Sequence, residues 1–438
     1  MKPRGLLVAV GVLVILGGAV FFSNKQQAAK EKAPATTSPK IVSIPDDQFQ
    51  EIRIQKASGE TLDLKKENGK WAITSPKAIA ADSDSVSSLV STLSSVTADS
   101  TIEDKPADLS AYGLAKPALE IQITPKSGKT VTLDIGDDTP TNSGAYAKVS
   151  SDPHVYAIGS FVKSSVDKKP DDLRDKRLLT FDQDKLTAVE LNSKGQAVQF
   201  GKNNNNEWTI VKPKPMRADG ATVDTLIGKL RDAKMDLTTE PAEAAKKYAE
   251  SSRIATVTTT DANGPQTLEV RKDKDNNYYA KSSVVEGIYK IPTDVGDGLN
   301  KSLDDFRNKK LFDFGFSDPT KLDVKGASYT KSGDKWMSGA KTMDNTTVQN
   351  LIDKLRDLTA AKFAESGGGQ PVFDATVTSN SGKRVEKVTI TKLGDKYFAQ
   401  RENESGIYEL DGKSVDDLQK AASDVKEAAP PPQPAKKK

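Results

Sequence analysis

Three aspartates at matching positions are the residues whose spacing most resembles a reactive cluster. Each one follows a tryptophan, at eleven positions after Trp71 and Trp208 and at eight after Trp336. Repeated carboxylates could bind a metal ion or transfer protons. However, apolar residues recur at +4, +7, +8 and +11 after each aspartate, a period typical of an amphipathic helix. We therefore expect helix N-caps, whose carboxylates accept hydrogen bonds from first-turn N–H groups. The aspartates are Asp82, Asp219 and Asp344.

Other sequence features that resemble reactive sites lack the residues that the chemistry needs. The only histidine, His154, lies in a turn-like segment with no Ser–His–Asp arrangement, so an exposed loop position is expected. Asp273, Asp275 and Asn277 are spaced like the first ligands of a calcium loop, but Tyr278 and Val284 stand where glycine and glutamate are required. We interpret that segment as a turn.

The triplet Asp-Phe-Gly at 313–315 matches a kinase metal-binding motif. A glycine-rich phosphate loop does not accompany it, so we treat the match as chance. The sequence thus predicts no catalytic, cofactor-binding or metal-binding residue, and we expect a protein that is not an enzyme. A hydrolase that uses paired carboxylates is a weaker alternative, because 61 acidic residues cluster by chance.

Composition excludes several classes of function. The chain has 438 residues, with 64 Lys and Arg against 61 Asp and Glu, so that the net charge is only +3. A nucleic-acid partner would need a concentrated basic face, and none is predicted. The absence of cysteine excludes disulfides, thiolate zinc sites and a lipid-modified N-terminal cysteine.

The N-terminal region predicts a membrane anchor. Residues 5–22 are 18 positions without a charge, enough for a helix that nearly crosses a hydrocarbon core of about 30 Å. Small residues are missing from the positions that signal peptidase would read, so we expect the segment to remain uncleaved. Lysines flank the segment on both sides, so the charge count leaves its orientation ambiguous, and we favour residues 1–4 on the cytoplasmic side with the chain after residue 22 across the membrane. A flexible tether at 23–40 and a disordered Pro/Lys tail at 428–438 complete this scheme.

Between the tether and the tail the sequence repeats three times. We place repeat 1 at 41–180, repeat 2 at 181–314 and repeat 3 at 315–427. Alternating apolar and polar residues predict antiparallel strands before each tryptophan and a further β-sheet after each amphipathic helix. The predicted fold class is therefore α+β, with each tryptophan ring covering one end of a sheet against the helix.

Two further signatures recur at fixed spacing. A hairpin in each repeat carries two aromatic residues ten positions apart, but the intervening turn leaves open whether both rings face one side. Those residues are Tyr146 and Tyr156, Tyr279 and Tyr289, and Phe398 and Tyr408. The exit segments 171–181 and 304–314 align with Arg174 and Arg307 in register. We interpret these basic segments as solvated linker helices, and the alternative is a patch that binds phosphate or an acidic partner. Repeat 3 keeps only the DDLQK of 416–420, which predicts a closing helix shortened by two turns.

These segments together resemble the bacterial domain-of-unknown-function family 4340. The resemblance rests on the stretch 109–123, which includes Tyr112 and Pro117, on the tryptophan–proline–aspartate unit, and on the exit segment of repeat 1. It implies a single-pass extracytoplasmic protein, associated in some members with gliding-type ABC-transport components. It carries over no catalytic residue.

The leading functional hypothesis is a non-catalytic interaction module, anchored in the lipid bilayer through 5–22 and accessory to an ABC-type export system through a protein partner. The alternative is a module that binds an envelope glycan or polymer by stacking it on the tryptophans and tyrosines. Burial of the three indole rings would count against this alternative, because a stacking platform must be exposed.

Overall fold

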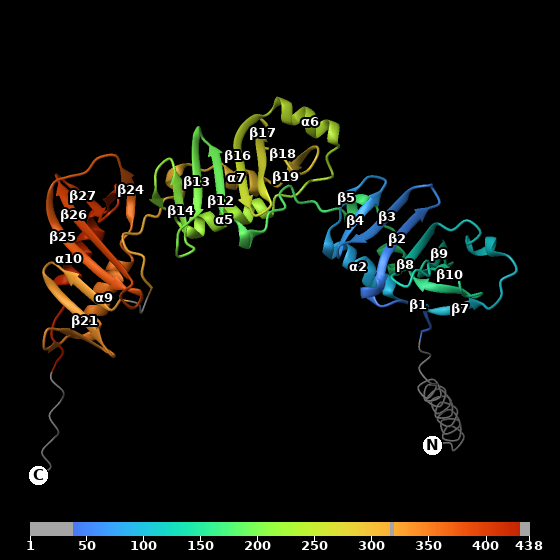
Figure 1. Cartoon of the computed structure of the whole chain (residues 1–438), viewed down its shortest axis with the longest axis horizontal. Coiled ribbons are helices and arrows are strands. Elements are labelled where there is room, and N and C mark those ends of the chain that lie inside the picture. The colour runs from blue at the N-terminus through green and yellow to red at the C-terminus, as the bar shows by residue number, and fades with distance from the viewer. Residues whose placement is uncertain (1–37, 316–318, 430–438) are drawn as a thin grey trace, which may run out of the picture. The chain divides into compact units, whose positions relative to one another are not determined.

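The computed structural model describes residues 38–315 and 319–429. The chain divides between Lys176 and Arg177 into two compact bodies. The N-terminal body contains repeat 1 up to Lys176, and the C-terminal body contains the end of its exit segment together with repeats 2 and 3 (Figure 1).

The predicted anchor at 5–22, nearly all of the tether and residues 430–438 of the tail lie outside the described residues. Within 38–315 and 319–429, no helix combines the length and the apolar character that a membrane crossing requires.

Repeat 1 forms a nine-stranded antiparallel sheet in the order β5-β4-β3-β2-β8-β9-β10-β11-β7, and β1 pairs separately with β6. Its strands are β1 Lys40–Ser43, β2 Phe49–Lys56, β3 Thr61–Glu67, β4 Lys70–Ser75, β5 Ile79–Ala80, β6 Ser95–Thr97, β7 Ser100–Glu103, β8 Leu119–Pro125, β9 Val131–Asp138, β10 Gly144–Val149 and β11 Val155–Gly159. Its helices are α2 Ser83–Ser94, α3 Ser160–Val166 and α4 Pro170–Leu173, with short 3₁₀ turns at Asp46–Gln48 and Leu109–Tyr112.

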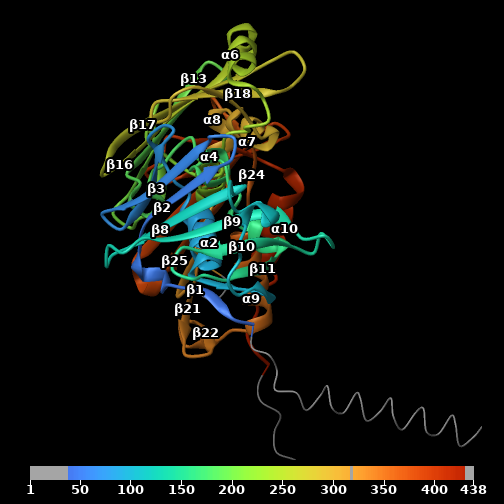
Figure 2. The same cartoon turned by 90° about the vertical axis from the view of Figure 1, so that its right-hand side faces the viewer.

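Repeat 2 forms an eight-stranded sheet in the order β15-β14-β13-β12-β16-β17-β18-β19. Its strands are β12 Ala188–Ser193, β13 Gln196–Lys202, β14 Trp208–Lys212, β15 Met216–Arg217, β16 Ser252–Asp261, β17 Gly264–Lys272, β18 Tyr278–Ser282 and β19 Ile288–Ile291. Its helices are α5 Gly220–Arg231, α6 Pro241–Glu250, α7 Thr293–Leu299 and α8 Leu303–Phe306, with a 3₁₀ turn at Gln183–Lys185. The helix α6 packs beside β18 and β19, apart from α7 and α8 (Figure 2).

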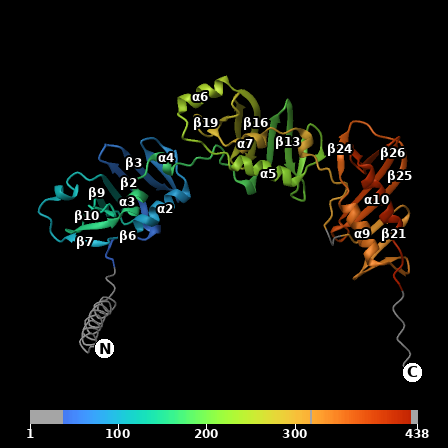
Figure 3. The ribbon, with the colours of Figure 1, turned by 180° about the vertical axis from the view of Figure 1, so that it is seen from behind.

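Repeat 3 forms a nine-stranded sheet in the order β23-β22-β21-β20-β25-β26-β27-β28-β24. Its strands are β20 Lys321–Val324, β21 Ala327–Ser332, β22 Lys335–Ser338, β23 Lys341–Thr342, β24 Ala360–Ala364, β25 Gln370–Ser379, β26 Arg384–Leu393, β27 Lys396–Arg401 and β28 Ile407–Leu410. Its helices are α9 Asn345–Arg356 and α10 Gly412–Ser423, which pack against each other (Figure 3), and a 3₁₀ turn lies at Asn380–Gly382.

The expectation of a separate second sheet in each repeat is wrong. The strands before and after the amphipathic helix join in one sheet through the pairs β2–β8, β12–β16 and β20–β25. Alternation in sequence indicates strands but does not say which strands pair, because pairing is decided by contacts distant in the chain. The α+β class, with antiparallel sheets and few helices, is confirmed.

The apolar stripe of each long helix lies against its sheet, as the period predicts. All twelve stripe side chains are buried. Burial of each Val, Leu or Ile stabilises the fold by about 1.5–3 kcal/mol, so these helices are held mainly by packing. The side chains are Val86, Leu89, Val90 and Leu93 on α2, Val223, Leu226, Ile227 and Leu230 on α5, and Val348, Leu351, Ile352 and Leu355 on α9.

The three aspartates are helix N-caps, as predicted. The carboxylate of Asp82 accepts from Ser85 N at 2.8 Å, and the carboxylates of Asp219 and Asp344 accept from the equivalent N–H groups at 2.8 Å and 3.0 Å. Their own N–H groups donate to the end of the same repeat, at Leu173 O, Phe306 O and Lys426 O. Each aspartate therefore starts the helix and also ties it to the exit segment.

That tie corrects the alignment of repeat 3. Arg174 and Arg307 follow the two tied carbonyls in repeats 1 and 2, and each forms a β-bridge to the residue before the aspartate. In repeat 3 the same bridge joins Met343 to Glu427. The structural counterpart of the two arginines is therefore Glu427, whereas Asp416 of the DDLQK segment lies inside α10.

The predicted shortening of the closing helix is consequently wrong. Repeats 1 and 2 close with a helix of 7 residues and one of 4, whereas α10 is a single helix of 12 residues. The sequence similarity of DDLQK to the exit segments is coincidental, because the contacts of the sheet and helices show which residues of the three repeats are equivalent.

Candidate functional site

The signature tryptophans contribute to packing rather than forming an open platform. Trp336 is 5% exposed within its core, and Trp71 and Trp208 are half-buried against theirs. Each tryptophan is paired across the sheet with a lysine, and the amines of Lys66 and Lys202 lie 5.8 Å and 5.1 Å from the first two ring centroids. These ammonium groups cover indole surface that a stacked sugar would need.

The aromatic pairs are divided between the two faces of each sheet. Tyr279 is paired with Lys290, and Ala280 is paired with Tyr289, so the two tyrosines point to opposite sides. The same one-residue offset separates the aromatic residues of the other two hairpins. The first aromatic residue of each pair is covered locally, for example by Tyr112 against Tyr146 at 5.0 Å and by Tyr248 of α6 beside Tyr279.

The two register arginines have half-buried side chains, 17% and 16% exposed, and each pairs with the aspartate three positions earlier. Arg307 also lies 3.4 Å over the ring of Phe363 in β24. The exit segments are therefore not solvated linker helices. After α4 and α8 they continue as extended chain that bridges the next repeat at Arg177–Lys234 and Lys310–Thr359.

The remaining candidates of the sequence occupy turns. Asp273 accepts hydrogen bonds from the N–H groups of Asp275 and Asn277 in the β17–β18 hairpin, as expected for a turn. His154 is 36% exposed and its Nδ1 pairs with Asp152, which also accepts a 2.7 Å bond from Tyr156 Oη. Among the described residues, no group of three or more His, Asp or Glu side chains is arranged to hold a metal ion.

A charged cluster joins repeats 2 and 3 inside the C-terminal body, and sequence reasoning missed it. Its centre is Arg217, at the end of the two-residue edge strand β15. Arg217 Nη1 donates to Asp313 Oδ2 at 2.5 Å, and Nη2 donates to Lys310 O at 2.5 Å and to Tyr408 Oη at 3.3 Å. Its Nε lies 2.9 Å from Glu404 Oε1, an ion pair without hydrogen-bond alignment. One side chain of repeat 2 thus contacts both the incoming segment and the last hairpin of repeat 3.

A second layer of ion pairs supports this centre. Arg401 pairs with Glu386 at 2.9 Å and with Glu404 at 2.7 Å, and its Nη1 donates to Leu311 O. Arg384 donates to Glu207 of repeat 2 at 2.6 Å. Every guanidinium of the cluster therefore faces a carboxylate, which offsets the cost of burying charge.

The electrostatics of the cluster follow from this pairing. Burial would lower the pKa of Arg217, but Tyr408, Asp313 and Glu404 outweigh it and raise that pKa. The pKa of Tyr408 is raised, mainly by burial. The pKa of Glu207 is lowered mainly by a side-chain hydrogen bond from Asn203, and to a smaller extent by Arg384. These shifts favour the charged guanidinium of Arg217, the neutral phenol of Tyr408 and the charged carboxylate of Glu207.

The counterpart positions in other repeats are neutral. Ala80 occupies in repeat 1 the sheet position of Arg217. In repeat 2, Gln266 accepts from Thr180 N and Ser282 donates to Leu178 O. Repeat 3 makes the same two contacts to its incoming segment with Glu386 and Arg401. The sequence alone could have indicated the cluster only where aligned positions of the repeats differ in charge, for example where Thr180 in one copy aligns with Asp313 in the next.

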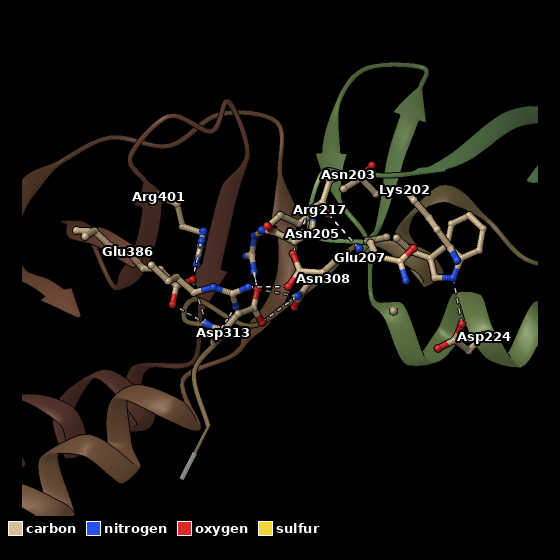
Figure 4. A pocket seen from close by; sticks show the side chains of 17 residues that line it. Lys202, Asn203, Asn205, Glu207, Arg217, Asp224, Asn308, Asp313, Glu386 and Arg401 are labelled. Atoms are coloured by element: carbon tan, nitrogen blue, oxygen red, sulfur yellow. Dashed lines mark hydrogen bonds and ion pairs between the residues drawn. The ribbon is translucent and has the colours of Figure 1, made fainter. Parts of the chain in front are cut away.

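An open pocket of about 770 Å³ adjoins the cluster (Figure 4). Its walls include Arg217, Asp313 and Glu386 together with the asparagine-rich turn before Trp208. The indole Nε1 of Trp208 donates to Asp224 at 3.1 Å. The volume would admit a small ligand, but most of its charged groups are already bonded to one another. The arrangement is suited to holding two repeats together.

The comparisons with known proteins identify a family. The family model described as "Domain of unknown function (DUF4340)" matches residues 71–209 and 208–381. The two matches start at Trp71 and Trp208, so each begins in the strand that carries the tryptophan, β4 or β14, and extends into the next repeat. No curated protein and no solved structure matches the chain significantly. Because the matches cover most of the chain, the protein belongs to the DUF4340 family, whose model it matches twice.

Proposed function

We propose that the protein is a non-catalytic interaction module of the bacterial envelope. In this proposal residues 5–22 anchor the chain in the inner membrane, the repeats lie in the periplasm, and a membrane protein of an ABC-type export system is the partner. The uncharged N-terminal run and the likeness to transport-associated members of the family support this location.

The proposal is supported mainly by the way in which the charged groups of the cluster pair with one another. Its arginines and carboxylates are bonded to one another across two repeats, a use of charge that fixes geometry rather than acts on a substrate. A module that binds a partner through several repeats gains affinity when those repeats are already held in place.

The polar faces of the sheets are the surface that we expect to bind. In each sheet the long amphipathic helix packs on one face, while the opposite face of the central strands carries polar side chains. In repeat 2 the helix α6 covers the β18–β19 end of that opposite face, where Tyr248 packs beside Tyr279. On β16 these are Thr256, Thr258 and Thr260, which alternate with buried neighbours. On β25, Asp374 and Thr376 have the same placement. Such a surface can donate and accept many hydrogen bonds with a protein partner.

Cross-linking in native membranes tests the proposal. Because the chain lacks cysteine, a single Thr258→Cys variant can carry a photo-activated cross-linker at one known position. Thr225→Cys on α5 is the matched control, since it places the same label on the helical face. We expect a membrane-protein adduct from position 258 and little from position 225. Failure of both positions, together with no partner after gentle solubilisation, would contradict the proposal.

A further inference from the structure

A second pocket, of about 660 Å³, lies at the end of the sheet of repeat 2. It is bounded by the tight turn between β12 and β13, by the start of β16 and by the end of α7. The side chains with polar groups that face it include Ser193, Lys194, Arg253 and Asn300. Among the described residues that line this pocket there is no Asp or Glu.

The corresponding place in repeat 1 is filled by an ion pair. Strand β2 of repeat 1 is equivalent to β12 of repeat 2. At the end of β2, Lys56 is paired with Leu119, and at the end of β12, Ser193 is paired with Ala255. Lys56 and Ser193 therefore occupy equivalent positions. Lys56 Nζ lies 2.5 Å from Asp167, the C-cap of α3. In repeat 2 the same C-cap position, at the end of α7, is Asn300. Replacement of the pair by Ser and Asn leaves the volume open.

The buried wall of this pocket carries an unused polar group. Ser193 is 5% exposed, and its Oγ has no hydrogen-bond partner among the described residues. A buried hydroxyl without a partner is unfavourable, so this position favours a group that binds there. Gln196 Oε1 accepts a hydrogen bond from Leu303 N, so the side-chain amide N–H groups of Gln196 remain available as donors.

The mouth of the pocket carries two cations. Lys194 has a φ of 50° at the tip of the two-residue turn, and Arg253 stands at a register shift of β16, where a bulge redirects side chains. Neither makes an ion pair with any residue in the described ranges. Lys194 acts electrostatically on Asp305, and Arg253 acts on Glu269, but neither acid lines the pocket.

We propose that this pocket binds an oxyanion, a phosphate group carried by a larger organic molecule. Two cations and a set of hydroxyl and amide donors match the charge and the acceptors of phosphate. The volume exceeds that of a free ion and lies within the range of ordinary ligand pockets, so it leaves room for the organic part. The proposal concerns repeat 2 alone and does not depend on the partner proposed above.

Calorimetric titration of the full chain in detergent tests this site with two probes, inorganic phosphate and a short-chain phosphatidylglycerol. We expect saturable binding that is tighter for the phosphodiester, and at least ten-fold weaker in Arg253→Gln. Arg231→Gln, at an exposed arginine on α5 outside this pocket, is the matched control and should bind like wild type. If inorganic phosphate binds as tightly, the ligand is a free ion and the organic part of the proposal is wrong.

A second variant separates binding from folding. Ser193→Lys combined with Asn300→Asp restores the ion pair of repeat 1, so the fold should be kept while binding of both probes is lost. Binding that persists unchanged in this variant and in Arg253→Gln, or no binding of either probe to wild type, would overturn the proposal.

Discussion

Arg217 Nη1 donates a 2.5 Å hydrogen bond to Asp313 Oδ2, although 96 positions separate the two residues. The bond joins the edge of the repeat 2 sheet to the segment that enters repeat 3. Since Ala80 stands at the position of Arg217 in repeat 1, this contact is a specialisation of one copy rather than a property of the repeat.

Removal of the Arg217 guanidinium should destabilise the C-terminal body strongly. The Arg217→Met variant leaves Asp313 without its paired guanidinium and Glu404 with Arg401 alone. The loss of one partner of a buried pair costs about 3 kcal/mol. Urea denaturation followed by far-UV circular dichroism measures this loss. Arg231→Met, at an exposed arginine, should change stability by less than about 0.5 kcal/mol. Equal effects of the two variants would show that the cluster adds no stability.

The N-cap aspartates can be separated from any acid–base or metal role by two substitutions at one position. Asp219→Ala should cost about 1 kcal/mol, because Thr222 N loses its acceptor. Asp219→Asn should be nearly neutral, since asparagine caps helices as well as aspartate does. Thermal denaturation compares the two. Equal damage from both substitutions would indicate that the negative charge itself is required.

The tryptophans should differ in their access to solvent. In three variants that each keep one tryptophan and replace the others by phenylalanine, acrylamide should quench Trp336 least, because it is 5% exposed. Trp71 and Trp208 should be quenched to an intermediate degree. Equally strong quenching at all three positions would restore the idea of an aromatic binding platform.

Asp152 gives an acid-dependent contribution to the stability of repeat 1. The N–H of His154, and bonds from Tyr156 and the His154 ring, lower the pKa of Asp152 to about 2 from 3.8. A lowered pKa stabilises the folded state above about pH 4, and that contribution is lost as the pH falls through about 2. Asp152→Asn should therefore be less stable than wild type at pH 6 by about 1 kcal/mol, a value reduced by partial exposure of the carboxylate.

The difference between wild type and Asp152→Asn should narrow as the pH falls from about 4 to about 2, as measured by denaturation at each pH. Glu60→Gln is a suitable control, because Glu60 is an exposed carboxylate in the turn between β2 and β3 of the same repeat. A difference that stays constant down to pH 2 would contradict the assignment.

Much of the fold could be predicted from local pattern. The spacing from Trp71 to Asp82 and the stripe that follows it determine a strand, an N-cap and a helix, and each of these depends on residues close in sequence. The pairing of β2 with β8 could not be predicted, because many strands of similar alternation compete for the same edge. The exit of repeat 3 at Glu427 was missed for the same reason, since a match of letters at 416–420 carried no information on pairing.

The charged cluster was harder to predict than the fold. Arg217, Asp313 and Arg401 come from three distant segments, and in sequence each is one ordinary charge among 125 charged residues. Only a comparison of the copies at matched positions distinguishes them, because a charge that replaces a neutral group at a packed position needs a partner.

Distance measurement between repeats 2 and 3 tests the central claim, that Arg217 fixes these repeats as one body. Spin labels at Thr225→Cys on α5 and Asn350→Cys on α9 can be attached without background, because the natural chain has no cysteine. Double electron–electron resonance should give one narrow distance distribution in the labelled wild type and in Arg231→Met, and a broad one in Arg217→Met. A broad distribution in the labelled wild type, or a narrow one that survives Arg217→Met, would contradict the claim.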